Sequence, residues 1–432
     1  MDKSKIIDNR EGYKKTELGW IPEEWEVKTI GELFEFKNGL NKEKEYFGKG
    51  TKIVNYVDVY KNRYLDNTII KGLVTVNDKE KGLFNTKKGD VFFTRTSETI
   101  DEIGMTSVLV EDIDDLVYSG FVLRARPKTQ ELDLLYKKYC FSDFNSRKEI
   151  IRKSSYTTRA LTSGTLLKDV LIKIPPLKEQ ERIAEILSTV DTQIDDTDKL
   201  IEKTKELKKG LMQRLLTKGI GHKEFKKTEV GEIPVEWEVK SLLEVSLSKG
   251  EYGIGASAID NLEGRPRYLR ITDIGEDSRL LNNEVKGFEE CDYENAILEE
   301  GDIVFARTGN TTGKSYVYSS NDGKLVYAGF LIRFRVNREI CCEKFLKYIV
   351  QTKRYWDWVK VMSTRSGQPG INSSEYASFK VQLPSLNEQQ QIGSILSSID
   401  TQIDEYENKK SKLEELKKGL MQQLLTGKIR TA

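Results

Sequence analysis

The chain has 432 residues, which suggests roughly two to four domains. Hydrophobic residues make up 38% of it and charged residues 32%, so there is enough apolar material for folded cores, and a wholly disordered chain is excluded. The 70 Lys and Arg nearly balance the 69 Asp and Glu. The net charge of +1 excludes a polycationic tail protein, but it does not exclude a local basic groove that binds nucleic acid.

The reactive side chains exclude several classes of enzyme. His222 is the only histidine, which argues against Ser-His-Asp or Cys-His catalysis and against a His-rich metal site. Cys140, Cys291, Cys341 and Cys342 lack zinc-ligand spacing, so we expect four buried thiols in a reducing compartment. There is no signal-peptide core and no run of about 18 apolar residues. We therefore expect a soluble, cytoplasmic protein with no metal, no cofactor and no membrane contact.

A long internal duplication dominates the sequence. The closely matching segments are Thr16–Lys28 with Thr228–Lys240, identical at ten of 13 positions, and Pro175–Thr217 with Pro384–Thr426, identical at 25 of 43. A period near 210 residues indicates two copies of a whole domain with an appendage, rather than a solenoid. The intervening stretches, about 40–88 and 252–300, match poorly. This pattern predicts a shared frame that carries two different variable surfaces.

The two globular parts, about 16–175 and 228–383, have a mixed α and β pattern. Short β-rich runs occur between turn residues, as in Asp90–Thr94 and Phe121–Ala125. We expect helices to follow them. The predicted helices are Leu132–Asn145 and Glu343–Val361. Helices and strands do not alternate regularly enough for a doubly wound parallel sheet, so we predict an α+β fold.

Each appendage reads as one long helix with a heptad seam that is polar in its middle. The apolar seam positions are Ile183, Leu187, Val190, Ile194, Ile201, Leu211 and Leu215 in the first copy, and Ile392, Leu396, Ile399, Ile403, Leu413, Leu420 and Leu424 in the second. A helix of about 40 residues is about 60 Å long and cannot cover its own seam. We therefore predict an antiparallel intramolecular coiled coil. The alternative is that each helix packs on its own domain.

The order of the segments also predicts a ring-like closure. The first long helix runs on into Phe225–Thr228, and the N-terminal region offers the same lead-in at Tyr13–Thr16 with no helix before it. The second long helix has no such lead-in after it. Symmetry between the copies then predicts that the C-terminal end lies beside residues 1–16.

Two glycine-rich segments resemble nucleotide-binding motifs only in part. Gly309–Ser315 has three residues between its glycines, whereas the phosphate loop has four, so a polar turn is the better interpretation. Gly253–Ala258 fits a dinucleotide pattern with alanine last, but the residues after it make a poor crossover helix. We predict no nucleotide chemistry at either segment, and we find no candidate catalytic or metal-binding residues.

Loops rich in hydrogen-bond donors occur in both halves. Arg and Lys bind phosphates and guanine edges, Asn and Gln can pair with adenine, and Ser and Thr contact phosphates. The candidate nucleic-acid contacts are Arg95, Thr96, Ser155, Tyr156, Thr158 and Arg159 in the first half, and Arg307, Thr308, Asn310, Thr311, Lys314, Arg365, Gln368 and Asn372 in the second. Ordinary surface turns are the alternative. The recurrence of the Arg-Thr pair in both halves favours a function.

The chain resembles the DNA-specificity subunit of type I restriction–modification systems over residues 16–426. The resemblance rests on Leu18–Trp25 with Val230–Trp237, on Gly301–Gly309, and on the paired starts and ends of the long helices, Pro175–Leu187 and Leu207–Gln213 in the first. Any one of these motifs is weak. Their order, repeated twice, is specific.

The resemblance implies two target-recognition domains, each of which reads one half of an asymmetric, two-part DNA site. The expected boundaries are 1–175 for the first recognition domain, 176–218 for the first spacer helix, 219–383 for the second domain and 384–432 for the second helix. The two long helices would hold the domains apart and would dock two copies of the modification subunit.

The resemblance also implies that this chain has no active site of its own. The modification partner would carry S-adenosylmethionine and methylate adenine, and motor-nuclease subunits would add restriction in the full complex. The competing hypothesis is a coiled-coil scaffold whose globular ends bind proteins. Salt-dependent binding to double-stranded DNA would distinguish the two, because release of counterions makes DNA affinity fall with salt.

Overall fold

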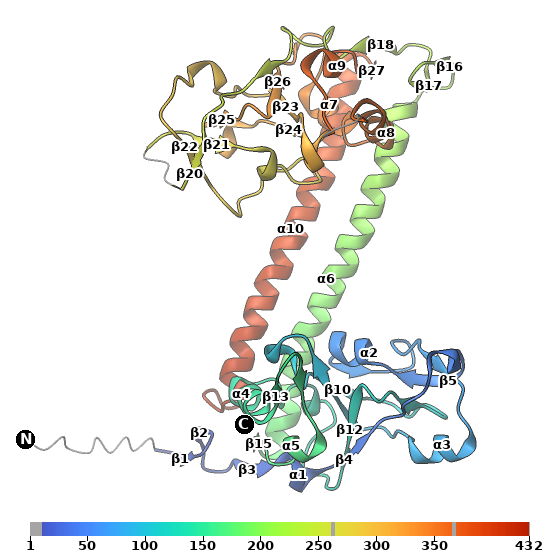
Figure 1. Ribbon diagram of the computed structural model, residues 1–432, viewed down its shortest axis with the longest axis vertical. Coiled ribbons are helices and arrows are strands. Elements are labelled where there is room, and N and C mark those ends of the chain that lie inside the picture. Colours follow the sequence, from blue (N-terminus) through green and yellow to red (C-terminus); the bar gives the residue numbers. More distant parts are fainter. Residues whose placement is uncertain (1–10, 261–263, 365–368, 432) are drawn as a thin grey trace, which may run out of the picture. The chain divides into compact units, whose positions relative to one another are not determined.

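The computed structural model describes residues 11–260, 264–364 and 369–431. The chain forms two compact units. The first extends to Thr197 and resumes at Lys409, and the second is Asp198–Asn408. Both long helices, α6 (Leu177–Lys218) and α10 (Leu386–Leu424), are therefore shared between the units (Figure 1). Each unit thus contains one globular part with one segment of each helix.

A five-stranded sheet organises the first unit. Its neighbours pair antiparallel, except for the two strands at one edge, which pair in parallel. In spatial order the strands are β4 (Phe34–Asn38), β12 (Val122–Pro127), β8 (Val91–Thr94), β10 (Thr106–Leu109) and β6 (Tyr64–Leu65). All four residues of β8 are buried, as expected for a strand that is covered on both faces.

The remaining elements of the first unit are short. The strands are β1 (Tyr13–Thr16), β2 (Gly19–Pro22), β3 (Glu26–Thr29), β5 (Phe47–Val54), β7 (Leu73–Val74), β9 (Thr96–Ser97), β11 (Val117–Tyr118), β13 (Ser155–Tyr156), β14 (Ala160–Leu161) and β15 (Leu171–Ile174). The helices are α1 (Ile30–Leu33), α2 (Tyr56–Lys61), α3 (Asp78–Leu83), α4 (Phe144–Lys153) and α5 (Gly164–Leu167). β11 pairs in parallel with β5, and β15 pairs antiparallel with β3.

The second unit repeats the order β4, β12, β8 and β10 of the first unit's sheet. Its equivalent strands are, in spatial order, β19 (Glu251–Tyr252), β26 (Leu331–Phe334), β23 (Ile303–Ala306) and β24 (Ser315–Val317), and all neighbours pair antiparallel. Its other strands are β16 (Phe225–Thr228), β17 (Gly231–Pro234), β18 (Glu238–Ser241), β20 (Ala258–Ile259), β21 (Arg267–Leu269), β22 (Gly287–Phe288), β25 (Leu325–Tyr327) and β27 (Lys380–Leu383). Its shorter helices are α7 (Glu343–Ile349), α8 (Lys353–Met362) and α9 (Ser373–Ala377). A parallel pair, β21 with β25, recurs here as well.

The predicted strands at Asp90–Thr94 and Phe121–Ala125 are confirmed as β8 and β12. The predicted helix Leu132–Asn145 is wrong. The Asp143 carboxylate accepts hydrogen bonds from the backbone N–H groups of Asn145 and Ser146, so α4 begins only at Phe144.

The predicted helix Glu343–Val361 is two helices, α7 and α8. The Thr352 hydroxyl accepts a hydrogen bond from the backbone N–H of Tyr355, at 3.3 Å, and so caps the start of α8. The apolar period continues through this break, which is why the sequence pattern alone did not reveal it.

Both ends of each long helix are buried in the globular cores. Ile183 and Leu187 of α6, with Leu424 of α10, belong to the core cluster around Trp25. At the other ends, Leu215 and Leu216 of α6 pack in the cluster of Trp237, together with Ile392 and Leu396 of α10. The alternative in which the helices pack on the domains therefore holds for the helix ends.

Most of the predicted seam positions are shielded from solvent. Buried positions are Ile183, Leu187, Val190, Ile201, Leu215, Ile392, Leu396, Ile403 and Leu424, and half-buried positions are Ile194, Leu211, Ile399, Leu413 and Leu420. In the second unit, Lys205 Nζ lies 2.7 Å from Glu407 Oε1, and Lys208 Nζ lies 2.6 Å from Asp400 Oδ1. Residue numbers rise along α6 as they fall along α10, so the two segments run in opposite directions within this unit.

A glutamate shielded from solvent, buried Glu179 in α6 and half-buried Glu388 in α10, fixes the first turn of each long helix. In the first unit, Glu179 accepts a hydrogen bond of 2.9 Å from the Trp25 indole and another of 2.9 Å from Arg430 Nε. In the second unit, the Trp237 indole donates to Glu388 over 3.1 Å, and His222 Nε2 lies 3.0 Å from the same carboxylate. Arg430, which follows α10, thus contacts the glutamate of the first unit, as His222, which follows α6, contacts the glutamate of the second.

The predicted closure is confirmed for the residues that the structure describes. The Tyr13 hydroxyl donates a hydrogen bond of 2.9 Å to the Gly427 carbonyl, and Arg430 forms an ion pair with Glu24. The C-terminal segment therefore lies against the N-terminal lead-in strands. Residues 1–10 are outside the described part.

Two expectations about the surface have different outcomes. Cys291 is exposed, which corrects the prediction of four buried thiols; Cys140, Cys341 and Cys342 are buried. Burial raises the pKa of the Cys341 thiol to about 12, so this thiol stays protonated near neutral pH. Within the described ranges, no helix is both long enough and apolar enough to span a membrane.

We predict that Glu179→Ala lowers the free energy of unfolding by about 2 kcal/mol, because the buried Trp25 indole and the Arg430 guanidinium lose their acceptor. Glu185→Ala is the matched control on the same helix. The Glu185 side chain is 64% exposed and pairs only with Arg182, three residues earlier, so the change should stay within about 0.5 kcal/mol. Urea unfolding measures both. Equal stability of the two variants would contradict the role of Glu179.

Candidate nucleic-acid interface

The structure brings the two predicted loops of the first unit together. β9 pairs with β14, and β14 pairs with β13, so Thr96 lies opposite Leu161 in the same three-stranded sheet that contains Ser155 and Tyr156. The Arg95 carbonyl accepts a hydrogen bond of 3.0 Å from the backbone N–H of Thr162. We call Arg95–Ser97, Phe121 and Ser155–Leu161 the first loop cluster.

The tip of the β13–β14 hairpin is open to solvent. The backbone N–H of Thr157 donates to the Arg159 carbonyl over 3.3 Å, which closes the turn, and Ser155, Thr158 and Arg159 are exposed. Tyr156 is 57% exposed. An exposed aromatic ring beside an exposed guanidinium is a combination that suits contact with bases and phosphates.

A glutamate links the first loop cluster to the diverged segment. Glu102 Oε1 accepts a hydrogen bond of 2.7 Å from the Tyr60 hydroxyl of α2, and Glu102 Oε2 accepts one of 3.4 Å from Ser97. Tyr60 also stacks on Tyr56, with ring centroids 5.7 Å apart. The position of the shared Arg-Thr loop therefore depends on residues that differ between the two halves.

The second unit also joins its two predicted loops. Thr308 forms a backbone bridge with Gly370, and the backbone N–H of Ile371 donates to the Arg307 carbonyl over 2.9 Å. The Arg307 guanidinium lies over the Tyr252 ring at 4.7 Å, which holds it in place by cation–π attraction. We call Arg307–Lys314, Phe330, Tyr252 and Pro369–Asn372 the second loop cluster.

Two further candidates in the second loop cluster, Lys314 and Thr311, already have partners within the protein. Lys314 Nζ forms an ion pair of 2.8 Å with Glu276 of the diverged segment and donates to the Ile274 carbonyl. The Thr311 hydroxyl donates to the Thr308 carbonyl over 3.2 Å, while Asn310 is exposed. Lys314 thus links this loop to the diverged segment, as Glu102 does in the first unit.

Asn372 acts as a helix cap, because its side-chain oxygen accepts a hydrogen bond of 2.9 Å from the backbone N–H of Glu375 at the start of α9. Arg365 and Gln368, the other two candidates, lie outside the described residues.

The arginines of the loop clusters carry positive charge that no neighbour neutralises. Among the residues that the structure describes, Arg95, Arg159 and Arg307 form no ion pair with a carboxylate. Elsewhere in the same units, Arg126 and Arg270 pair closely with Asp90 and Asp273. Charge that remains unpaired at an exposed loop favours an anionic partner such as a phosphate backbone.

The candidate residues did not include a phenylalanine that both clusters share. Phe121 is 63% exposed and Phe330 is 59% exposed, at equivalent positions of the duplication. The Phe121 carbonyl accepts a hydrogen bond of 3.1 Å from the backbone N–H of Arg95, and the Phe330 carbonyl accepts one of 3.0 Å from Arg307. The repeated Gly-Phe pair was visible in the sequence, but only the structure reveals that its rings are exposed beside the arginines.

The loop that resembles a phosphate loop is a polar turn, as expected. The backbone N–H groups of Gly309, Thr312 and Gly313 donate to the carbonyls of Pro369, Gly309 and Ala306. Amides that are hydrogen-bonded inside the protein are not available to cradle a phosphate.

Gly253 is explained by a close backbone approach rather than by a dinucleotide. A Cβ atom on Gly253 would lie 2.1 Å from the Tyr327 carbonyl oxygen of β25. Gly39 makes the same approach in the first unit, where a Cβ would lie 2.1 Å from the Ser119 oxygen. Both glycines therefore belong to the shared frame.

The structure also holds, within its described ranges, no group of His, Cys, Asp or Glu that could bind a metal ion.

A family model for the type I restriction modification DNA specificity domain matches residues 22–206 and 234–415. The chain belongs to this family. It is a type I restriction–modification specificity subunit with two target-recognition domains, one in each matched region.

Specificity subunits of known systems are similar to this chain over almost its full length. The MjaVIII specificity subunit of Methanocaldococcus jannaschii is 29% identical over 97% of this chain and 96% of its own length. The EcoKI specificity subunit of Escherichia coli K12 is 23% identical over an alignment that covers 87% of this chain and 82% of the EcoKI subunit.

Solved structures share the fold. The S subunit of a type I system from M. genitalium superposes with a TM-score of 0.59 at 18% identity, over 93% of this chain and 96% of that one. A chain from a study of complex assembly and conformational transition in a type I system gives a TM-score of 0.51 at 17% identity, over 95% and 99% of the two chains. The mixed α/β architecture with two domains is therefore that of type I specificity subunits.

We predict that Gly253→Ala destabilises the subunit by about 2–3 kcal/mol, because the added methyl overlaps the Tyr327 carbonyl and the backbone must shift. Gly255→Ala is the matched control, two residues away. A Cβ on Gly255 would meet no atom within 4 Å, and the change should be neutral or stabilise by up to about 1 kcal/mol. The midpoint of urea unfolding measures both variants. A Gly253 variant as stable as the control would rule out the close approach as the reason for this glycine.

Proposed function

We propose that this specificity subunit recognises an asymmetric, two-part DNA site, with each target-recognition domain reading one half. The first domain corresponds to residues 1–175 and the second to 219–383. One observation carries this proposal. Both loop clusters contain an identical Arg and an identical exposed Phe, and in each unit the cluster is linked to a diverged segment, through Glu102 in the first and Lys314 in the second.

The shared and the diverged residues suggest different contacts. Arg95 and Arg307 are identical in the two copies, as are Phe121 and Phe330, so they cannot by themselves distinguish two unlike half-sites. We assign them to what all DNA shares, the phosphates and sugars. Thr96 and Thr308 are identical as well. We assign base contacts to the diverged segments and to candidates that differ between the clusters. These are Ser155, Tyr156, Thr158 and Arg159 in one domain, and Asn310, Lys314, Arg365 and Gln368 in the other.

Two joined readers explain how short half-sites can suffice. Each mismatched base pair costs about 1–3 kcal/mol, so one domain reading a few pairs discriminates only modestly. Joining two domains in one chain adds their energies and makes the second binding event intramolecular. The long helices, at 176–218 and 384–432, would serve as the spacer, arranged as an antiparallel intramolecular coiled coil. Opposite helix directions within the second unit support this arrangement.

Repeated apolar positions on the long helices support the docking of two partner subunits. Leu207 of α6 is 52% exposed, and Leu416, its equivalent in α10, is 51% exposed. An apolar position that occurs twice on the surface fits two copies of one partner. We propose that these partners are modification subunits that carry S-adenosylmethionine and methylate adenine in the cytoplasm. Motor-nuclease subunits would join the same complex for restriction, and this chain would contribute no catalytic group.

Arg307→Ala should weaken or relax recognition of one half-site only, and Arg365→Ala should act on the same half. The measurement is a map of methylated adenines in a host that carries this gene with its modification partner. We expect a two-part motif for the natural chain and a degenerate second-domain half for Arg365→Ala, which is assigned a base contact; Arg307→Ala, assigned a phosphate contact, should keep the motif but weaken binding through that half, so that its sites are methylated less completely. Lys353→Ala is the control, because that side chain is 87% exposed on α8 and pairs only with Asp357. A single continuous motif, or a relaxed sequence at both halves in Arg365→Ala, would refute the proposal.

Leu207→Lys and Leu416→Lys should each weaken the docking of one modification subunit. We expect each single variant to form a complex with one partner copy at concentrations where the natural chain binds two, and the double variant to bind neither. A charge in place of a central apolar contact typically costs an interface several kcal/mol. Native mass spectrometry of the purified complex measures the stoichiometry, and Glu185→Lys, an exposed change on α6, is the control. Unchanged stoichiometry in the double variant would exclude this docking surface.

A further inference from the structure

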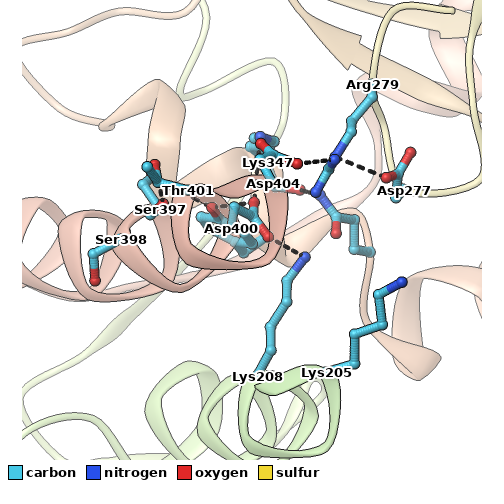
Figure 2. A network of polar contacts seen from close by, with 12 residues as sticks. Lys205, Lys208, Asp277, Arg279, Lys347, Ser397, Ser398, Asp400, Thr401 and Asp404 are labelled. Atoms are coloured by element: carbon cyan, nitrogen blue, oxygen red, sulfur yellow. Dashed lines mark hydrogen bonds and ion pairs between the residues drawn. The ribbon is translucent and has the colours of Figure 1, made fainter. Parts of the chain in front are cut away.

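Asp400 of α10 lies at the centre of a polar cluster in the second unit (Figure 2). Its Oδ1 atom pairs with Lys208 Nζ of α6 at 2.6 Å, and its Oδ2 atom accepts a hydrogen bond of 2.7 Å from the Tyr348 hydroxyl of α7. Lys347 Nζ, also on α7, lies 3.6 Å from the same oxygen. One carboxylate thus joins both long helices to the globular part of the unit.

The same cluster recurs in the first unit with the helices exchanged. Asp191 of α6 forms an ion pair with Lys417 of α10, and Asp191 Oδ2 accepts a hydrogen bond of 2.7 Å from the Tyr139 hydroxyl. Asp191 is the equivalent of Asp400 in the duplication, and Lys417 is the equivalent of Lys208. The duplication has therefore kept a Tyr–Asp–Lys set at both places where the helices meet a domain.

Asp400 is held as a carboxylate and Tyr348 as a neutral hydroxyl. Burial alone would raise the pKa of the Asp400 carboxyl, but the Lys208 ammonium and the Tyr348 hydroxyl outweigh burial, and the pKa lies below its usual value. Burial raises the pKa of Tyr348, so this hydroxyl keeps the proton that it donates. Charge-assisted hydrogen bonds among partly buried groups have a narrow range of favourable geometries.

An arginine from each diverged segment reaches the same place. In the second unit, Arg279 forms an ion pair with Asp404, one turn from Asp400 on α10, and its Nε lies 2.8 Å from Asp277 (Figure 2). In the first unit, Arg63 lies with its Nη1 4.0 Å from Met421 Sδ of α10 and its guanidinium 5.9 Å from the Tyr139 ring centroid. The variable part of each domain therefore contacts the helices directly, beside the shared set.

We propose that these two clusters set the angle at which each recognition domain is held on the long helices, and thereby the spacing and rotational phase between the two half-sites. We call them the anchoring clusters: Tyr348, Asp400, Lys208 and Arg279 in the second unit, and Tyr139, Asp191, Lys417 and Arg63 in the first. Their residues are positioning residues, because they act through the orientation of the domains. The proposal rests on the proposed function, since it assumes a two-part site.

The geometry of DNA makes such control necessary. One added base pair shifts a half-site by about 3.4 Å and turns it by about 35°, given roughly 10–10.5 pairs per turn. Helix length fixes the distance between two points along the spacer, but the tilt of a domain on its helix also moves its DNA-contacting loops. A rigid domain–helix joint is therefore needed before helix length can select one spacer length.

The test uses the complete complex with its modification partner and a series of DNA duplexes. The duplexes carry the two half-sites found for the natural chain, with spacers from two pairs shorter to two pairs longer. The variants are Asp400→Asn, Tyr348→Phe and Arg279→Gln; the last is a partly exposed position, where loss of folding is not expected. Lys205→Gln is the matched control, because Lys205 makes an exposed ion pair between the same helices with Glu407, at the edge of the cluster and 3.9 Å from Arg279, and the change leaves the four cluster residues themselves in place.

We expect the natural complex and the Lys205 variant to methylate one spacer length. In the cluster variants, the preference for that length over a length one pair longer or shorter should fall roughly tenfold, with half-site sequences unchanged. A loss of stability alone would lower methylation of every duplex and leave the spacer preference as it was, and that result would overturn the proposal. A natural complex with no two-part site would instead overturn the proposed function itself, and the spacing inference with it.

Discussion

A helix of about 40 residues with an apolar stripe is stable in water only where other groups cover the stripe. In this subunit, both ends of α6 and of α10 are buried in globular cores, and every other feature follows from that burial. Each unit is built around the end of one long helix and the beginning of the other. A glutamate, buried Glu179 or half-buried Glu388, fixes each beginning to a tryptophan of the adjacent lead-in segment. The helices are thus part of both domain cores.

The duplication explains which parts of the molecule are alike. The four-stranded order of the central sheet, the parallel strand pair and the close approach at Gly39 and Gly253 recur in both units. The diverged segments contact this frame at two kinds of place. Glu102 and Lys314 link them to the loop clusters, and Arg63 and Arg279 link them to the long helices. Variation in these segments can therefore change both the bases that are read and the fit of the domain to its helices.

The sequence predicted the features that depend on repeated or periodic patterns. The heptad period identified both long helices, and the duplication identified the two domains and the closure between Tyr13 and the segment after α10. Hydrophobic period alone failed where a polar side chain interrupts the chain. Asp143 and Thr352 cap helices inside stretches that look continuous, so two predicted helices had the wrong bounds.

The loop clusters were predictable in part. Composition identified the loops rich in hydrogen-bond donors, and strand pairing in β13, β14 and β9 then explains why those of the first unit meet. The sequence could not predict that Phe121 and Phe330 are exposed, because a phenylalanine after a buried strand is more often part of the core. It also could not predict the partners of Arg63 and Arg279, because contacts between distant segments depend on the fold and not on local pattern.

The central claim is that one frame holds two independent readers, each specified by its own diverged segment. The most direct measurement exchanges residues 252–300 for the corresponding segment of another specificity subunit and compares maps of methylated adenines before and after the exchange. We expect one half of the motif to change, while the other half keeps its sequence. A change in both halves, or in neither, would contradict the account.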